Sequence, residues 1–220
     1  MNKIVIICIL LVSRVMLSQL PIKMDRDNQI LEYNGYKVSY NETHEQSNWV
    51  LYKIKRGDFI CDEGSERKNR FRDDKDIETG SSHSDDYIRS GYDRGHLKPA
   101  GVEPCDQDRI DETFNMVNIS PQHPSFNRGI WRKLENYERV LCGESDSLIV
   151  YSGPILSNDL KKIGDVSVPE YFFKIIYIYK GDRKGVSVYY IPNKKSNKDI
   201  TDFIVPLSFI NRMTGFVFPE

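Results

Sequence analysis

Residues 91–100 read GYDRGHLKPA, a short polar stretch in which Asp93, Arg94, Gly95 and His96 follow one another. A carboxylate, a guanidinium, a glycine and an imidazole therefore occupy consecutive positions. An imidazole with a pKa near neutrality can take a proton from water at ordinary pH, which makes the stretch a candidate reactive site. Short charged strings also occur as solvated turns, so the residues that follow along the chain must decide between these interpretations.

A second segment, NISPQHPSFNRGIWRKLENYER at 118–139, carries polar residues within a helical pattern. Apolar residues recur at three- and four-residue spacing at Ile130, Trp131, Leu134, Tyr137, Val140 and Leu141. This pattern predicts a helix that begins near Ser125 and ends before Gly143. Asn127 and Glu135 would then lie about 80° apart around the helix and about 12 Å apart along it, on a shared face.

These two side chains suggest a hydrated metal site. A separation of about 12 Å is too long for both residues to ligate one ion directly. Magnesium keeps several waters, so one oxygen donor can hold the ion while an acidic neighbour holds its water shell. The sequence therefore predicts Asn127 as the inner ligand and Glu135 as the outer one.

The rest of the chain predicts an α+β domain. Apolar, β-branched and aromatic runs indicate strands at residues 49–54, 148–151, 171–179 and 185–191, the last two joined by a connection at 180–184. Residues 62–92 are dense in charged and small residues and read as a long surface loop, which tends to be functional. We expect a sheet core with helices on its faces.

The first 18 residues have the outline of a secretory signal peptide, with Lys3 before an apolar run and a small residue at Ser18. An uncleaved anchor or an organelle signal remains an alternative, and of the organelle signals a mitochondrial one would be richer in Arg and Ser. The expected domains are the signal at 1–18 and one domain at 19–220. Without the signal the chain has no predicted membrane segment.

Charge and cysteine content narrow the function classes. The chain has 31 basic and 32 acidic residues, and removal of the signal leaves a net charge of −3. Stable nucleic-acid binders usually carry a basic excess, so contact with a polyanion must be local, as in an enzyme that binds, cuts and releases. Cys61, Cys105 and Cys142 then allow one disulfide and one free thiol, and the sequence leaves the pair open.

Several segments together resemble the DNA/RNA non-specific endonucleases, the family that includes endonuclease G and related secreted bacterial nucleases. Residues 33–54 look like the family's entry strands, FRDD at 71–74 precedes the active site, and DRGH at 93–96 is its signature. Residues 118–139 are similar to its metal-bearing segment, SGP at 152–154 follows, and MTGFVF at 213–218 looks like its closing strand. The resemblance implies a ββα-metal, or His-Me finger, nuclease with a central mixed or antiparallel sheet flanked by helices.

The family's roles map onto matching positions of this chain. His96 resembles the general base, Asn127 the metal ligand, Glu135 the acid behind the metal's waters, and Asn118 a site-organising asparagine. Arg94 and a second arginine would bind the phosphate. Arg67 is our choice for the second, with Arg70 and Arg72 as rivals.

The resemblance implies a secreted, extracellular or periplasmic endonuclease that uses Mg²⁺, or alternatively Mn²⁺, to hydrolyse DNA and RNA with little sequence specificity. Homodimerisation is known among family members, and a mitochondrial location is the alternative. Two other functions stay open, a nuclease restricted to RNA and a catalytically dead relative that binds nucleic acid or a partner protein. The latter would normally have lost the histidine or the metal ligand, and this chain has neither loss.

Overall fold

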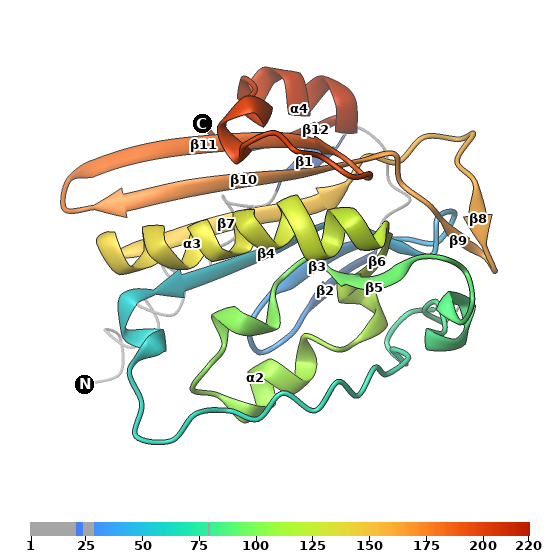
Figure 1. The fold of residues 1–220 in the computed structure, drawn as a ribbon, viewed down its shortest axis with the longest axis horizontal. Helices are drawn as coiled ribbons and strands as arrows, with labels where there is room; N and C mark the ends of the chain where they lie inside the picture. Colours follow the sequence, from blue (N-terminus) through green and yellow to red (C-terminus); the bar gives the residue numbers. More distant parts are fainter. Residues whose placement is uncertain (1–20, 24–28, 79) are drawn as a thin grey trace, which may run out of the picture.

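The computed structural model describes residues 21–23, 29–78 and 80–220. The predicted signal peptide at 1–18 lies outside these residues. A six-stranded antiparallel sheet, in the order β11-β10-β7-β4-β3-β2, forms the centre of the fold (Figure 1). Helices flank this sheet, which confirms the predicted α+β class. No helix in the described part of the chain is long and apolar enough to cross a membrane.

The predicted strands lie within longer ones. The sheet consists of β2 (Gln29–Glu32), β3 (Lys37–Asn41), β4 (Gln46–Lys55), β7 (Ser147–Pro154), β10 (Tyr171–Lys180) and β11 (Arg183–Pro192). The connection between β10 and β11 is shorter than predicted, because Lys180 pairs with Arg183 and only Gly181 and Asp182 form the turn. Gly181 has a φ of 56°, which suits a two-residue hairpin.

The sheet is buried on both faces, since adjacent β4 residues pack into different cores. Val50 and Tyr52 belong to a core that includes residues of α3 (Arg132–Glu144), and this helix lies across the sheet in Figure 1. Trp49 and Leu51 belong to a second core on the opposite face. That core also contains residues of α4 (Leu207–Thr214) and of β12 (Phe216–Val217), which pairs with β1 (Ile22–Lys23).

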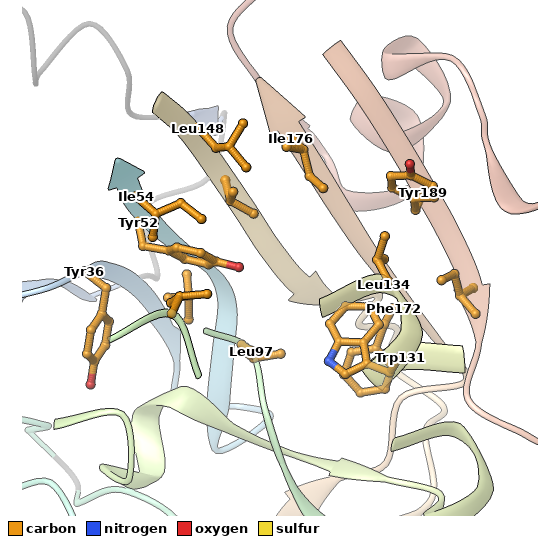
Figure 2. Close-up of a cluster of buried hydrophobic side chains, with 14 of the residues drawn as sticks. Tyr36, Tyr52, Ile54, Leu97, Trp131, Leu134, Leu148, Phe172, Ile176 and Tyr189 are labelled. Carbon is orange, nitrogen blue, oxygen red and sulfur yellow. The ribbon is translucent and has the colours of Figure 1, made fainter. Parts of the chain in front are cut away.

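The first core connects the helix, the sheet and the signature segment. Figure 2 shows Trp131, the residue before α3, and Leu134, in the first turn of α3, beside Phe172 of β10. Leu97, the residue after His96, belongs to the same cluster and is fully buried. The main core therefore fixes both the signature segment, through Leu97, and the segment that leads into α3, through Trp131.

The segment expected to be one regular helix is divided. A π-helical turn, η5 (Phe126–Trp131), precedes α3, and Gly129 inside it has non-helical angles of φ −108° and ψ −108°. Gly143 lies inside α3, which ends at Glu144, so the predicted end of the helix is wrong by two residues. Because insertions of this kind break the regular helical spacing, the predicted 80° and 12 Å relation between Asn127 and Glu135 does not apply.

Two further expectations change. Only Phe216–Val217 of the predicted closing strand at 213–218 is a strand, because Met213 and Thr214 still belong to α4. Gly215, with a φ of 72°, ends that helix in the left-handed conformation. The long charged segment at 62–92 is mostly irregular, as predicted, apart from the 3₁₀ turn η2 (Ser84–Tyr87).

The remaining elements are short. They are η1 (Arg56–Phe59), β5 (Asp93–His96), η3 (Ala100–Val102), α2 (Gln107–Glu112), η4 (Met116–Asn118), β6 (Ile119–Gln122), β8 (Lys162–Ile163), β9 (Val166–Ser167) and η6 (Ile200–Phe203). A disulfide joins Cys61 to Cys105, and Cys142 is free and buried. This answers the question of which cysteines pair.

Candidate active site

The signature residues form β5, which pairs with β6 in a two-stranded antiparallel sheet. His96 pairs with Ile119 and Gly95 with Ser120. A Cβ atom on Gly95 would lie 2.2 Å from Cδ of Gln122, so a side chain at this position would collide with Gln122. Close packing, and not an unusual backbone angle, therefore explains the glycine between Arg94 and His96.

His96 sits in a pocket of aromatic rings. Its ring centroid lies 4.8 Å from that of Phe114 and 5.8 Å from that of Phe71, and the residue is only 8% exposed. Burial, with a further contribution from the charge of Arg67, lowers the pKa of His96 to about 3. The imidazole is therefore neutral at neutral pH, and its buried Nε2 has no hydrogen-bond partner among the described residues.

The backbone around His96 is held from two sides. Trp131 Nε1 donates to the His96 carbonyl oxygen over 3.2 Å, which ties β5 to the end of the π-helical turn η5. The Asn118 side chain accepts from the Lys98 backbone nitrogen at 2.8 Å and donates to the Lys98 and Thr113 carbonyls at 3.0 and 2.8 Å. Asn118 is fully buried, so it fixes the chain path after His96.

Asn127 lies on the π-helical turn and is oriented by Asp93. Its Nδ2 donates to Asp93 Oδ2 at 2.9 Å, and its Oδ1 makes no hydrogen bond with the described residues. Arg128 grips the same carboxylate with two hydrogen bonds, of 2.8 and 2.6 Å. Burial acts to raise the pKa of Asp93, but the bonds from Arg128 and Asn127 outweigh it and lower the pKa, so Asp93 stays ionised.

Glu135 lies on the first turn of α3, three residues before Glu138, which forms a buried ion pair with Lys174. Lys174 Nζ lies 2.8 Å from Glu138 Oε2, and both side chains are fully buried. Burial raises the pKa of Glu135 to about 7, although the charge of Lys174 acts in the opposite direction. Glu135 forms no ion pair with Arg132 or Arg139 among the described residues, so it is not simply a surface charge neutralised by a helix neighbour.

A cleft of about 330 Å³ brings most of the predicted residues together. Its walls are formed by Arg67, Arg94, His96, Pro99, Ala100, Gly101, Asn127, Arg128, Arg132, Glu135, Asn136 and Arg139. Every predicted site residue except the buried Asn118 lines it. His44, His83 and His123 do not, although His123 lies near in the sequence.

The structure separates the three candidate arginines at 67–72. Arg67 lines the cleft, with its guanidinium 5.5 Å from the Phe114 ring centroid. Arg72 instead bonds to Asn115 and to the Asp111 carbonyl, outside the cleft. Arg70 is exposed and lines no part of the cleft.

Arg94 reaches the cleft from β5. Its guanidinium donates to the Ser84 hydroxyl and to the Ser84 carbonyl oxygen, the latter at 3.3 Å. It also lies 4.8 Å from the ring centroid of Phe71, the aromatic residue beside His96. The side chain is therefore held in place before any substrate arrives.

Sequence reasoning missed three cleft arginines, Arg128, Arg132 and Arg139. The signal was present, because Arg132, Glu135 and Arg139 follow the spacing of one helix face. Arg139 Nη2 donates to Asn136 at 2.5 Å, whereas Arg132 is exposed and has no partner among the described residues. Together with Arg67 and Arg94 they give the cleft a strongly positive wall in a chain with a net charge of −1.

The donor set suits a hard cation that keeps its waters. No group of three or more His, Cys, Asp or Glu side chains in the described residues could enclose a metal ion. The cleft instead offers the Asn127 amide oxygen, with Glu135 on the same wall. One oxygen donor with an acidic neighbour fits Mg²⁺, which dehydrates reluctantly and is often bound by few protein ligands.

Comparison with known proteins assigns the family. Residues 17–220 match the model for the DNA/RNA non-specific endonucleases. The chain belongs to this family. It is 32% identical over 215 residues to a nuclease of Syncephalastrum racemosum, covering 87% of this chain and 67% of that protein. It is 31% identical over 204 residues to the mitochondrial nuclease EXOG of Danio rerio, covering 84% of this chain and 59% of that protein.

A solved structure of this endonuclease family shares the fold. The EndoG/EndoGI complex, described as showing the mechanism of EndoG inhibition, contains a chain that superposes with a TM-score of 0.83. The two chains are 28% identical, and the match covers 94% of this chain and 90% of the other. The ββα-metal nuclease fold expected from the resemblance is therefore confirmed.

Proposed function

We propose that the protein is a divalent-metal-dependent endonuclease that hydrolyses phosphodiester bonds of DNA and RNA with little sequence specificity. One observation carries the proposal. An unpartnered, neutral imidazole at His96 shares a cleft with the Asn127 amide oxygen, Glu135 and five arginines. These are the groups that water activation and phosphate binding require.

His96 is the proposed general base. A base must be unprotonated before it acts, and burial keeps the His96 imidazole in that form at neutral pH. Phe71 and Phe114 fix the ring and exclude water from its sides. Asn118 acts indirectly by holding the backbone that carries His96.

Asn127 is the proposed ligand of Mg²⁺ or Mn²⁺, with Glu135 bonded to water molecules on the ion. When bound, the ion would supply positive charge for the pentacovalent phosphate and the leaving oxygen. Arg67 and Arg94 would bind non-bridging phosphate oxygens, a task that suits the planar guanidinium fork. Arg132, exposed and without a partner among the described residues, would bind a neighbouring phosphate.

Among the described residues, the cleft is lined by five arginines that can bind phosphate. Sequence readout needs side chains placed against base edges, usually from a helix or strand in the major groove. The cleft arginines are suited to the backbone, which is the same repeating unit in every sequence. Low sequence specificity is the expected result.

The remaining predictions concern the whole protein. We propose one endonuclease domain at residues 19–220, which the family match over 17–220 supports. A secreted, extracellular or periplasmic location agrees with the Cys61–Cys105 disulfide, because such bonds persist in oxidising compartments. The relatives named as mitochondrial support the mitochondrial alternative. Homodimerisation stays a prediction from the family resemblance.

A gel assay of purified protein tests the proposal. Supercoiled plasmid, single-stranded DNA and RNA are incubated at matched concentration with Mg²⁺, with Mn²⁺ or with a chelator. We expect all three polymers to be cut with metal and none with chelator. Cleavage of RNA alone would favour the restricted nuclease, binding without cleavage the inactive relative, and activity in chelator would contradict the metal mechanism.

A further inference from the structure

Residues 61–72 form an irregular segment that carries Arg67 to the cleft, and we call it the Arg67 segment. It contains no helix or strand beyond a single bridge at Arg72, and it runs past α2 along one edge of the molecule (Figure 1). A segment without regular structure cannot fix a side chain by itself. The position of Arg67 therefore depends on what fastens this segment to the rest of the fold.

Its first half is fastened to residues 103–107. The disulfide joins Cys61 to Cys105, and Ser65 donates from its backbone nitrogen to the Pro104 carbonyl at 2.6 Å. Glu66 exchanges two hydrogen bonds with the Gln107 side chain, at 2.8 and 3.0 Å. Arg67 follows directly after these contacts.

The anchor at 103–107 belongs to the same rigid block as His96. Glu103 is 2% exposed and lies 2.5 Å from Lys98 Nζ and 2.8 Å from Arg109 Nη2. Lys98 follows His96 by two residues, and its backbone is held by Asn118. The disulfide thus links the Arg67 segment covalently to the structure that holds the proposed base.

The second half is fastened without a covalent link, by backbone hydrogen bonds and by the Phe71 ring, whose centroid lies 5.2 Å from that of Phe114. Arg72 donates from its backbone nitrogen to the Phe114 carbonyl at 3.0 Å and accepts from the Met116 nitrogen at 2.8 Å. Between the two fastenings, Arg67 bonds to Asn69 of its own segment and to no other described residue, and it lies over the Phe114 ring. The N-terminal fastening, with its one covalent link, therefore sets where Arg67 points.

We propose that the Cys61–Cys105 disulfide is a positioning device for Arg67, so that its reduction lowers the rate of phosphodiester cleavage. The proposal rests on the function proposed above for the cleft. It gives the enzyme full activity in an oxidising compartment and reduced activity in a reducing one.

The chemistry is a thiol–disulfide exchange. A dithiol attacks one sulfur through its thiolate, the Cys61–Cys105 bond breaks, and a mixed disulfide forms. The second thiol of the reagent then closes its own ring disulfide, so that two electrons and two protons pass to Cys61 and Cys105. Cys61 is exposed, which gives the reagent access, whereas the fully buried Cys142 does not compete.

The test compares oxidised protein with protein reduced by dithiothreitol, with the thiol count measured by labelling and mass spectrometry. Cleavage of plasmid is measured in Mg²⁺ with near-ultraviolet circular dichroism on the same samples. We expect reduction to lower kcat/KM by about 10- to 100-fold, the scale of a small misplacement of a binding group, while the spectrum stays native. The Cys61→Ser, Cys105→Ser variant should match the reduced protein.

A second arm separates positioning from general stability. In an Arg67→Gln background, reduction should change kcat/KM by less than about twofold, because the group that the disulfide positions is already absent. In an Arg94→Gln background, on the paired strand β5, the full effect of reduction should remain. An equal loss in all three backgrounds, a loss that accompanies unfolding, or no loss on full reduction would each overturn the proposal.

The outcome is distinguishable from failure of the proposed function. If oxidised protein cuts no nucleic acid, the proposed function is wrong. If oxidised and fully reduced proteins cut equally well, only the positioning role of the disulfide is wrong.

Discussion

Asp93 Oδ2 accepts a hydrogen bond of 2.9 Å from Asn127 Nδ2. Asp93 is the first residue of the DRGH sequence, and the family resemblance assigned it no role in the site. The bond turns the Asn127 amide so that its oxygen has no hydrogen-bond partner among the described residues. Asp93 therefore prepares the proposed metal ligand, while Arg128 keeps Asp93 ionised.

Asp93→Ala should weaken metal binding, because the Asn127 amide loses its orienting partner. Loss of such a partner typically costs about 10- to 100-fold in metal affinity or activity. The measurement is the Mn²⁺ dissociation constant by electron paramagnetic resonance, alongside the Mg²⁺ dependence of plasmid cleavage. Lys133→Gln is the control, because this exposed residue does not line the cleft. Unchanged metal affinity in Asp93→Ala would contradict this account.

The raised pKa of Glu135 predicts a pH-dependent stability. Its pKa rises from 4.5 unfolded to about 7 in the fold, so the native state holds a proton that the unfolded chain has lost between these values. This contribution to stability is complete below pH 4.5, the pKa of Glu135 in the unfolded chain, and it is lost as pH rises through about 7. In metal-free buffer, the wild type should lose about 1–3 kcal/mol relative to Glu135→Gln between about pH 5 and pH 8. Urea denaturation measures both proteins, and a pH-independent difference would contradict the assignment.

Lys174→Met should destabilise the protein strongly. Glu138 would remain buried without its cation, and breaking a buried pair in this way costs about 3–5 kcal/mol. Tyr52 donates to the same Glu138 oxygen over 3.1 Å and would not replace the charge. The double variant Lys174→Met, Glu138→Leu should recover much of the loss in urea denaturation. A single variant as stable as the wild type would contradict the claim that the Lys174–Glu138 pair is needed for stability.

Arg132→Gln should reduce the salt dependence of nucleic-acid binding. Loss of one phosphate contact lowers the slope of log K against log salt by roughly 0.7–0.9. A fluorescent oligonucleotide in chelator, which blocks cleavage, gives the binding constants by anisotropy. Lys133→Gln is the control, because this neighbouring exposed residue does not line the cleft. Equal slopes for the two variants would remove Arg132 from the substrate track.

The sequence predicts the sheet well because its strands are local patterns. The apolar runs in β4, β7, β10 and β11 can be recognised as strands without knowing which strands they pair with. The resemblance at DRGH and at 118–139 predicted which side chains share the cleft, because the family's motifs carry their spacing with them. Asn127, Glu135, His96, Arg94 and Arg67 all line it.

Features that depend on distant partners were not predictable. The π-helical turn arises where Gly129 departs from helical backbone angles, and the spacing of apolar residues does not predict this departure. The choice of Cys105 over Cys142 depends on how residues 103–107 pack beside the Arg67 segment. A lysine in a strand usually reads as exposed, but Lys174 is buried because Glu138, on α3, lies opposite it.

The rate of plasmid nicking by His96→Ala in Mg²⁺ tests the central claim most directly. His96 is the one neutral, unpartnered imidazole in the cleft, so its loss should lower the rate by about 10²- to 10⁴-fold, the usual contribution of a general base. Circular dichroism should show an unchanged fold. A folded His96→Ala protein that nicks plasmid at the wild-type rate would contradict the proposed mechanism.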